Sequence, residues 1–148
     1  MRALKFRAWD DRFQKTFEVL KINWVSGALW HEGCASSDSV PACFKNESHC
    51  KLMQYTGLKD KNGVGIYEGD ILCYKFDKKS DSGGYISGTY GFHSENCVLV
   101  EFKNGCFVVD GKYLGMSGSL DDYLSKPNLE LEIIGNIYEN PELLGSNK

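Results

Sequence analysis

Hydrophobic and polar positions alternate near the start of the chain, as they do along a strand with one buried face. The apolar side chains Leu4, Phe6 and Ala8 share one parity, and basic side chains occupy the positions between them. Residues 16–24 carry apolar side chains at both parities, which fits a strand buried on both faces or a helix. A third short apolar run, residues 28–31, follows a Ser-Gly turn. The three runs predict a meander of strands.

Further strands are predicted in the second half of the chain. Residues 97–102 and 106–109 are apolar, β-branched runs on either side of Lys-Asn-Gly. Asn-Gly accepts the positive φ of a tight turn at least cost, so this is the clearest hairpin signal in the sequence. Residues 129–138 alternate and predict another strand, whereas residues 120–124 fit one helical turn with Ser119 as its N-cap.

A mainly β fold follows from these patterns. They add up to at least six short strands, joined by Gly and Asn turns, with one or two short helical turns, the second starting at Pro141. Such a set of strands predicts a small SH3-like or bent-sheet barrel. A chain of 148 residues corresponds to about one domain, so residues 1–148 are predicted to form a single β-rich domain.

The densest local signal lies in residues 52–72, where an Asn-Gly step and a Glu-Gly-Asp bend divide strand-like runs. The candidate binding residues of this stretch are acidic, basic and aromatic: Tyr55, Asp60, Lys61, Tyr67, Glu68 and Asp70. The carboxylates could join Glu130 and Glu132 in a metal site. An aspartate beside a glycine more often hydrogen-bonds its own backbone and fixes the turn, and the spacing ties no base or nucleophile to this stretch. We therefore expect this stretch to form a structural corner of the fold rather than a metal site or an active site.

Composition and charge narrow the range of partners. A net charge of −3 and a pI of about 5.6 argue against a phosphate-binding face over the whole surface. A module that binds single-stranded nucleic acid stays open as an alternative, because tyrosines interleave with lysines beside the loops. Those lysines are Lys59, Lys61, Lys75, Lys78, Lys79 and Lys103. Nearby aspartates cancel much of their charge, so nucleic acid is not the favoured partner.

The compartment is predicted to be the cytoplasm. No run of about 18 or more apolar residues is present, and the N-terminus lacks the apolar core of a secretory signal. We therefore expect no membrane partner. In an intracellular protein the six cysteines are expected to be reduced thiols.

Residue types that bind zinc gather in one region of the sequence: His31, Cys34, Cys43, His49 and Cys50. Zinc takes four such ligands, yet no Cys-x-x-Cys pair is present and the gaps match no standard zinc knuckle. A cysteine nucleophile would need a histidine close to it in space, which spacing cannot show. No nucleotide-binding or hydrolase motif occurs. We expect no cofactor and no enzymatic activity, and the sequence leaves open whether these five side chains bind a metal.

Three long blocks stand at the start, the middle and the end of the chain. The first is residues 5–10, Lys-Phe-Arg-Ala-Trp-Asp; the second joins residues 53–63 to residues 66–71; the third is residues 132–144. In this order the blocks resemble the YopX-type proteins of bacteriophages and prophages. The resemblance covers essentially the whole chain.

The resemblance implies a small, phage-encoded, mostly β protein inside a bacterial cell. It implies no established enzymatic activity and no agreed ligand, and it offers no catalytic residues to carry over. Residues 32–50 and 77–96 look like local insertions whose cysteines, histidines and lysines match no family pattern. We predict a non-enzymatic module that binds a protein, with a second copy of itself (a homo-oligomer) among the partners considered. An exposed patch near residues 55–70 is its expected binding face.

Overall fold

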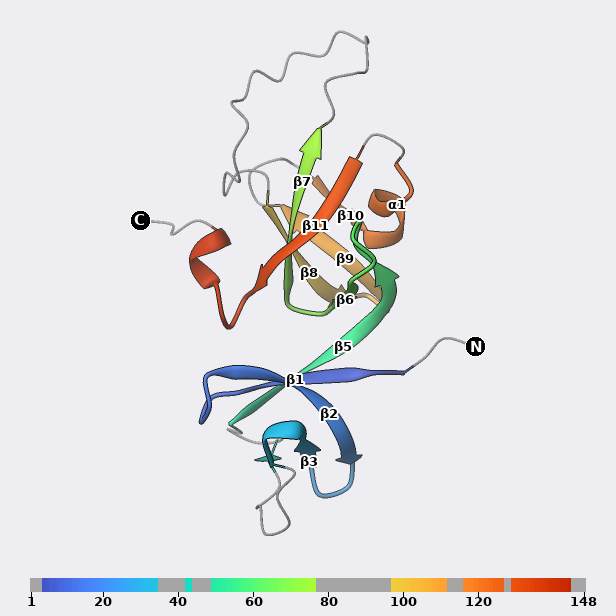
Figure 1. The fold of residues 1–148 in the computed structure, drawn as a ribbon. Coiled ribbons are helices and arrows are strands. Elements are labelled where there is room, and N and C mark those ends of the chain that lie inside the picture. The colour runs from blue at the N-terminus through green and yellow to red at the C-terminus, as the bar shows by residue number, and fades with distance from the viewer. Residues whose placement is uncertain are drawn as a thin grey trace, which may run out of the picture. The chain divides into compact units, whose positions relative to one another are not determined.

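The computed structural model describes residues 4–34, 42–43, 49–76, 97–111, 116–126 and 129–144 (Figure 1). The chain divides into two compact units, Met1–Gly57 and Leu58–Lys148. Buried apolar side chains form separate clusters in the two units, so each unit has a core of its own. The single domain expected from the chain length stays a prediction.

Antiparallel strands build the first unit. They are β1 (Phe6–Asp10), β2 (Lys15–Asn23), β3 (Ala28–His31), β4 (Ala42–Cys43) and the first part of β5 (Cys50–Lys59), with the 3₁₀ turn η1 (Glu32–Cys34) after β3. In hydrogen-bonded order the sheet runs β4-β3-β2-β1-β5 and continues to β6 (Gly65–Tyr67). The pairings of β1 with β2 and of β2 with β3 confirm the predicted meander.

A β-bulge in β2 explains why residues 16–24 carry apolar side chains at both parities. The register of β2 against β3 shifts between Val19 and Lys21, so Leu20 is the extra residue. The bulge changes the alternation, and Val19 and Ile22 both pack on the core cluster of the first unit. Leu20 is left 59% exposed. Of the two predicted alternatives, strand and helix, the structure shows a strand.

Five antiparallel strands form the sheet of the second unit, in the order β10-β9-β8-β7-β11. They are β7 (Asp70–Phe76), β8 (Cys97–Lys103), β9 (Cys106–Gly111), β10 (Met116–Ser119) and β11 (Leu129–Asn136). The helix α1 (Leu120–Leu124) contributes buried side chains to one core cluster, and the 3₁₀ turn η3 (Pro141–Leu144) packs leucines on another. With both faces of β7 covered, Ile71, Leu72 and Cys73 are all buried in succession.

The turn signals of the second unit are confirmed. Asn104 and Gly105 connect β8 to β9 with φ angles of 53° and 82°, the positive values expected of an Asn-Gly hairpin turn. Ser119 occupies the N-cap of α1, although its hydroxyl makes no capping hydrogen bond. Pro141 begins η3, as predicted for the second short turn.

The prediction of a mainly β protein with short helical turns is confirmed. The described strands do not close into the predicted barrel, because each sheet has two end strands: β4 and β6 in one, β10 and β11 in the other. No helix in the described ranges is long and apolar enough to cross a lipid bilayer.

Candidate functional site

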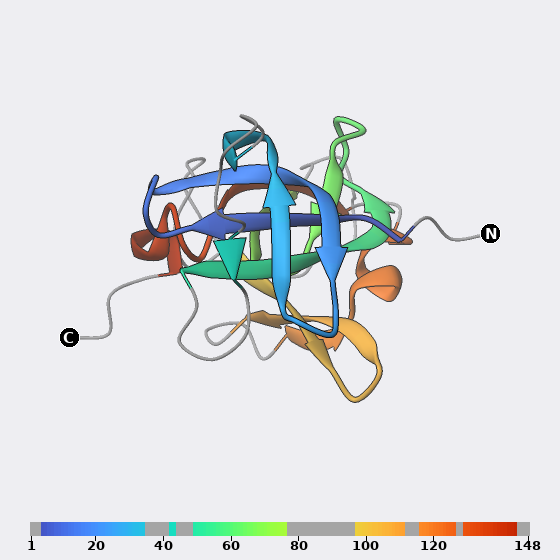
Figure 2. The same cartoon turned by 90° about the horizontal axis from the view of Figure 1, so that it is seen from below.

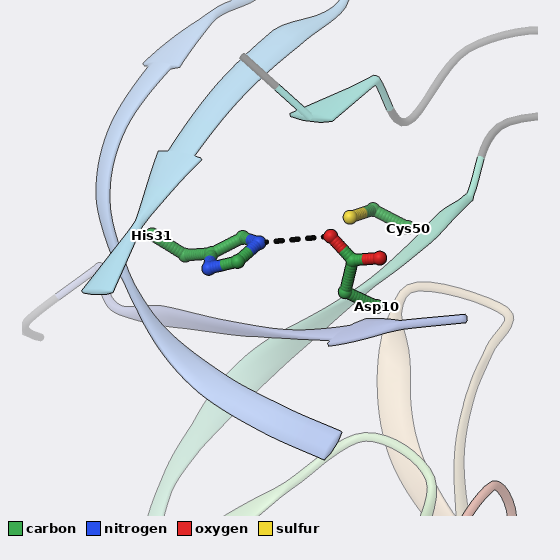
Figure 3. Close-up of side chains that lie close together, drawn as sticks. All are labelled: Asp10, His31 and Cys50. Atoms are coloured by element: carbon green, nitrogen blue, oxygen red, sulfur yellow. Dashed lines mark hydrogen bonds and ion pairs between the residues drawn. The ribbon is translucent and has the colours of Figure 1, made fainter. Parts of the chain in front are cut away.

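Asp10, His31 and Cys50 meet in the interior of the first unit (Figure 3). Asp10 ends β1, His31 ends β3 and Cys50 begins β5. The pairing of β1 with β5 places Asp10 opposite Cys50. The ligand atoms of the three side chains lie within 4.8 Å of one another, and none of the three residues is more than 1% exposed. Within the described residues this is the one group of three side chains with metal-binding chemistry.

The carboxylate of Asp10 is the centre of this cluster. Arg12 donates from Nη2 to Oδ2 at 2.6 Å and from Nε to Oδ1 at 3.0 Å, and its backbone N–H donates to Oδ1 at 2.9 Å. His31 Nε2 lies 3.0 Å from Oδ2, and the Cys50 thiol lies beside the carboxylate (Figure 3). Burial opposes the charge of Asp10, but the hydrogen bonds from Arg12 and His31 outweigh it and hold the pKa of Asp10 well below its usual range.

The backbone fixes the protonation of the His31 ring. The Gly33 N–H donates to Nδ1 of His31 at 3.1 Å, and only an unprotonated Nδ1 accepts that bond. The ring proton therefore lies on Nε2, where it is donated to Asp10. Phe17 stacks on the imidazole with ring centroids 4.4 Å apart and planes 16° apart. The ring is held in both position and tautomer.

This geometry suits a buried structural network better than a metal or thiol centre. A metal bound at His31 Nε2 would require the ring proton to move to Nδ1, against the Gly33 N–H. It would also compete with Arg12, a cation already on the Asp10 carboxylate. Cys50 lies beside that carboxylate, whose lowered pKa makes it a poor acceptor for the thiol proton, and the nearby His31 ring is already hydrogen-bonded to Asp10 and Gly33. All three side chains are shielded from solvent, so a substrate has no direct access to them.

The zinc-type ligands predicted from the sequence are only partly brought together. His31 and Cys50 meet, whereas the side chain of His49 is exposed. The side chains of Cys34 and Cys43 lie outside the described residues. Asp10 was missed, because in the sequence it belongs to a Trp-Asp-Asp-Arg turn and only strand register brings it to Cys50. The sequence signal that could have indicated Asp10 is its Asp-x-Arg spacing, which lets the arginine side chain hydrogen-bond back to the aspartate across a tight turn.

In the second unit, the carboxylate of Asp60 organises the turn between β5 and β6. Its Oδ1 accepts the backbone N–H groups of Asn62 and Val64, both at 2.9 Å, and its Oδ2 accepts the N–H of Ile133 in β11 at 3.2 Å. Asp60 is 7% exposed. These bonds are the turn chemistry that the sequence favours for this stretch.

Lys61 and the acidic residues of β11 form an ion-pair group. Lys61 Nζ lies 2.8 Å from a carboxylate oxygen of Glu132 and 3.7 Å from one of Glu130. The hydrogen bond to Glu132 raises the pKa of Lys61. The two glutamates that could have joined the carboxylates of this stretch in a metal site are therefore paired with a lysine.

The Glu-Gly-Asp bend is a second corner. Gly69 has a φ of 80°, and Asp70 accepts the Tyr67 N–H on Oδ2 at 2.8 Å while being fully buried. The side chains of Tyr67 and Glu68 are half-buried beside it. Tyr55 lies on β5 in the first unit, whereas the other candidate binding residues belong to the second.

Two strand cysteines of the second unit lie in contact. Cys73 and Cys97 face each other across β7 and β8, with their Sγ atoms 3.3 Å apart. The hydrogen bond to Cys73 and burial raise the pKa of Cys97 well above its usual range, which keeps the thiol protonated. The strand positions of Cys73, Cys97 and Cys106 predict three small apolar core residues; this is confirmed for Cys73 and Cys97, whereas Cys106 is exposed.

A groove on the first unit is lined by large apolar side chains. Its volume is about 310 Å³, at the lower end of the usual range of binding sites, about 300–1,000 Å³. Three of its lining residues are exposed by more than half: Leu4 at 71%, Leu20 at 59% and Trp24 at 54%. Trp24 also packs edge-on against Phe6, with ring centroids 5.7 Å apart. The apolar side chains at both parities of residues 16–24 are the one trace of this grouping in the sequence, and they do not distinguish an exposed Leu20 from a buried one.

The fold is that of a mainly β protein whose described strands form two open antiparallel sheets. Comparison with known proteins identifies its family. The model of the YopX family, described as YopX protein, matches residues 5–145, and the chain belongs to that family.

Two solved structures are similar to this chain. Protein EF1440 from Enterococcus faecalis is 28% identical, with a TM-score of 0.58 and coverage of 97% of this chain and 99% of that one. Protein yopX from Bacillus subtilis is 22% identical, with a TM-score of 0.58 and the same coverage. At that identity the second likeness shows the fold alone. No curated protein matches this chain.

Proposed function

We propose that this protein is a non-enzymatic module that binds another protein through its first unit. The observation that carries the proposal is the groove between β1 and β2. Single exposed apolar side chains are ordinary on a folded surface, whereas several around one hollow mark an interaction site. Leu4, Leu20 and Trp24 meet that description.

The hydrogen bonding and burial of the polar candidate residues also support a binding role rather than catalysis. Asp60 and Asp70 bond to backbone N–H groups, and the Asp10 cluster is buried with its hydrogen bonds made. A catalytic acid, base or nucleophile has to reach a substrate, and these groups are committed to the fold. We infer a binding role in a bacterial cytoplasm, in keeping with the phage origin that the family resemblance implies.

Nucleic acid is a weaker alternative on this evidence. Lys61 is paired with Glu132, and Lys103 Nζ lies 2.6 Å from Glu101 and 3.2 Å from Asp110. A phosphate backbone would have to compete with these carboxylates. The side chains of Lys75, Lys78 and Lys79 lie outside the described residues.

Affinity capture from bacterial lysate with three forms of the full chain tests the proposal. The forms are the wild type, Leu20→Asp in the groove, and Val64→Asp. Val64 is 53% exposed and belongs to the stretch where the sequence places the binding face. Both substitutions are at exposed positions, so both variants are expected to stay folded, with unchanged circular dichroism.

A protein retained by the wild type and by Val64→Asp, but lost with Leu20→Asp, supports the groove. If capture is lost with Val64→Asp instead, the binding face lies near residues 55–70, as the sequence predicts, and the groove is not the binding site. Capture of no protein sensitive to either change, together with a monomeric wild type in sedimentation, would overturn the binding proposal altogether.

A further inference from the structure

β2 has one edge that is paired along only part of its length. β1 pairs with β2 from Asp10↔Lys15 to Arg7↔Glu18 and no further. Beyond Glu18, β2 pairs with β3 on its opposite edge, as far as Asn23↔Ala28. In the sheet order β3-β2-β1, the stretch from Val19 to Asn23 therefore faces no described strand on the side of β1.

The bulge accounts for this opening. A bulge adds twist and bends its strand, and β2 turns away from β1 where Leu20 is inserted. Figure 2 shows β2 running beside β1 and then bending to run beside β3. The start of β1 stays with its other neighbour, because Phe6 pairs with Gln54 and the Tyr55 N–H donates to the Lys5 carbonyl.

The groove lies in the opening between the two strands. Leu4 and Phe6 line it from the side of β1, and Leu20, Ile22 and Trp24 from the side of β2. A hollow flanked by apolar side chains next to an open strand edge is the arrangement that binds extended peptides. The edge pairs with the peptide backbone, and the hollow takes alternate side chains.

Charge around the groove favours an acidic occupant. Lys5 and Lys21 line it, against one carboxylate, Glu18. The Lys21 ammonium lies over the ring of Trp30, its cross-strand partner in β3, at 4.8 Å, so Lys5 is the lysine on the side of β1. Complementary charge at the rim of a binding site favours the matching partner and rejects the opposite one.

We propose that an extended segment of a partner protein adds as a strand to the Val19–Asn23 edge of β2. The segment carries large apolar side chains at alternate positions and an acidic residue that meets Lys5 or Lys21. The edge offers about 17 Å of strand at about 3.4 Å per residue. This inference rests on the proposed function, because it names the ligand of the same groove.

The test uses a random decapeptide display library against the full chain, with Leu20→Asp as the subtracted control. The expected result is enrichment of peptides that alternate large apolar residues and carry Asp or Glu. Replacing the acid of an enriched peptide by Lys should weaken binding about tenfold or more. N-methylation of alternate backbone amides, which keeps every side chain, should abolish binding if the peptide pairs as a strand.

The other outcomes separate this inference from the function it rests on. Peptides that tolerate N-methylation at every position, or that carry Lys or Arg in place of the acid, would overturn strand addition by an acidic segment. If no peptide is enriched while Leu20→Asp still loses capture from lysate, the protein-binding function stands and strand addition by an acidic segment is overturned. A wild-type dimer that Leu20→Asp converts to monomer would make a second copy the occupant, and would also overturn it.

Discussion

Gly33 donates its backbone N–H to Nδ1 of His31 at 3.1 Å, and this bond decides which ring nitrogen carries the proton. The glycine can approach this closely because it has no side chain. A Cβ at position 33 would lie 2.7 Å from Phe17 Cε1 and 3.0 Å from His31 Cε1. The stacked Phe17 and His31 rings, the glycine and Asp10 are thus one packed group.

Gly33→Ala is expected to destabilise the protein by about 1–3 kcal/mol, the usual cost of overpacking a fitted site. The added methyl must push Phe17 or His31 aside and weaken the bond to Asp10. Urea unfolding measures the loss. In a Phe17→Leu background the same change should cost less, because a smaller side chain leaves room for the methyl. Equal costs in the two backgrounds would contradict the packing argument.

Chelation tests whether the Asp10 cluster holds a metal. Incubation with EDTA, followed by gel filtration, is expected to leave the thermal unfolding midpoint unchanged, because the hydrogen bonds of the cluster are complete without an ion. Elemental analysis of the untreated protein accompanies the measurement. If chelation lowers the unfolding midpoint of the wild type but not that of Cys50→Ser, the cluster binds a metal. That outcome would contradict its assignment as a structural network without an ion.

Local patterns predicted the parts of the fold that depend on neighbouring residues. The Asn104-Gly105 hairpin follows from the φ preference of two residues, and the Asp60 turn from the short reach of an aspartate to its own backbone. The bulge at Leu20 and the meeting of Asp10 with Cys50 depend on register between strands distant in sequence. No local preference encodes such a register, so neither the groove nor the buried cluster could be predicted.

Stability is expected to depend on the charge of Asp10. Because its pKa is lowered in the folded protein, ionised Asp10 stabilises the fold above its ordinary pKa of about 4, and this contribution is lost as the pH falls below that value. Asp10→Asn should cost about 2–4 kcal/mol at about pH 7. The difference from wild type should shrink at about pH 3. Urea unfolding at both pH values, with exposed Asp121→Asn as the control, checks this; a difference independent of pH would contradict it.

Thiol labelling should separate the cysteines by burial. Cys106 is exposed, whereas Cys50, Cys73 and Cys97 are buried. With iodoacetamide under native conditions, mass spectrometry is expected to find Cys106 modified before the three buried thiols, which stay protected until denaturant is added. Early modification of Cys50 would show that the Asp10 cluster opens to solvent.

Asp60→Ala separates a structural turn from a binding residue. The substitution removes the acceptor of three backbone N–H groups, two in the β5–β6 turn and one in β11. Since Asp60 is buried, the loss should be about 2–4 kcal/mol in urea unfolding, against less than about 0.5 kcal/mol for exposed Asp122→Ala. Asp60→Asn keeps one carbonyl oxygen and should lie between them. Capture of the partner, measured at a temperature where Asp60→Ala remains folded, should match wild type, because the groove belongs to the other unit. An Asp60→Ala variant that keeps wild-type stability but no longer captures the partner would instead show that Asp60 contacts the ligand. The binding face would then lie near residues 55–70, as the sequence predicts.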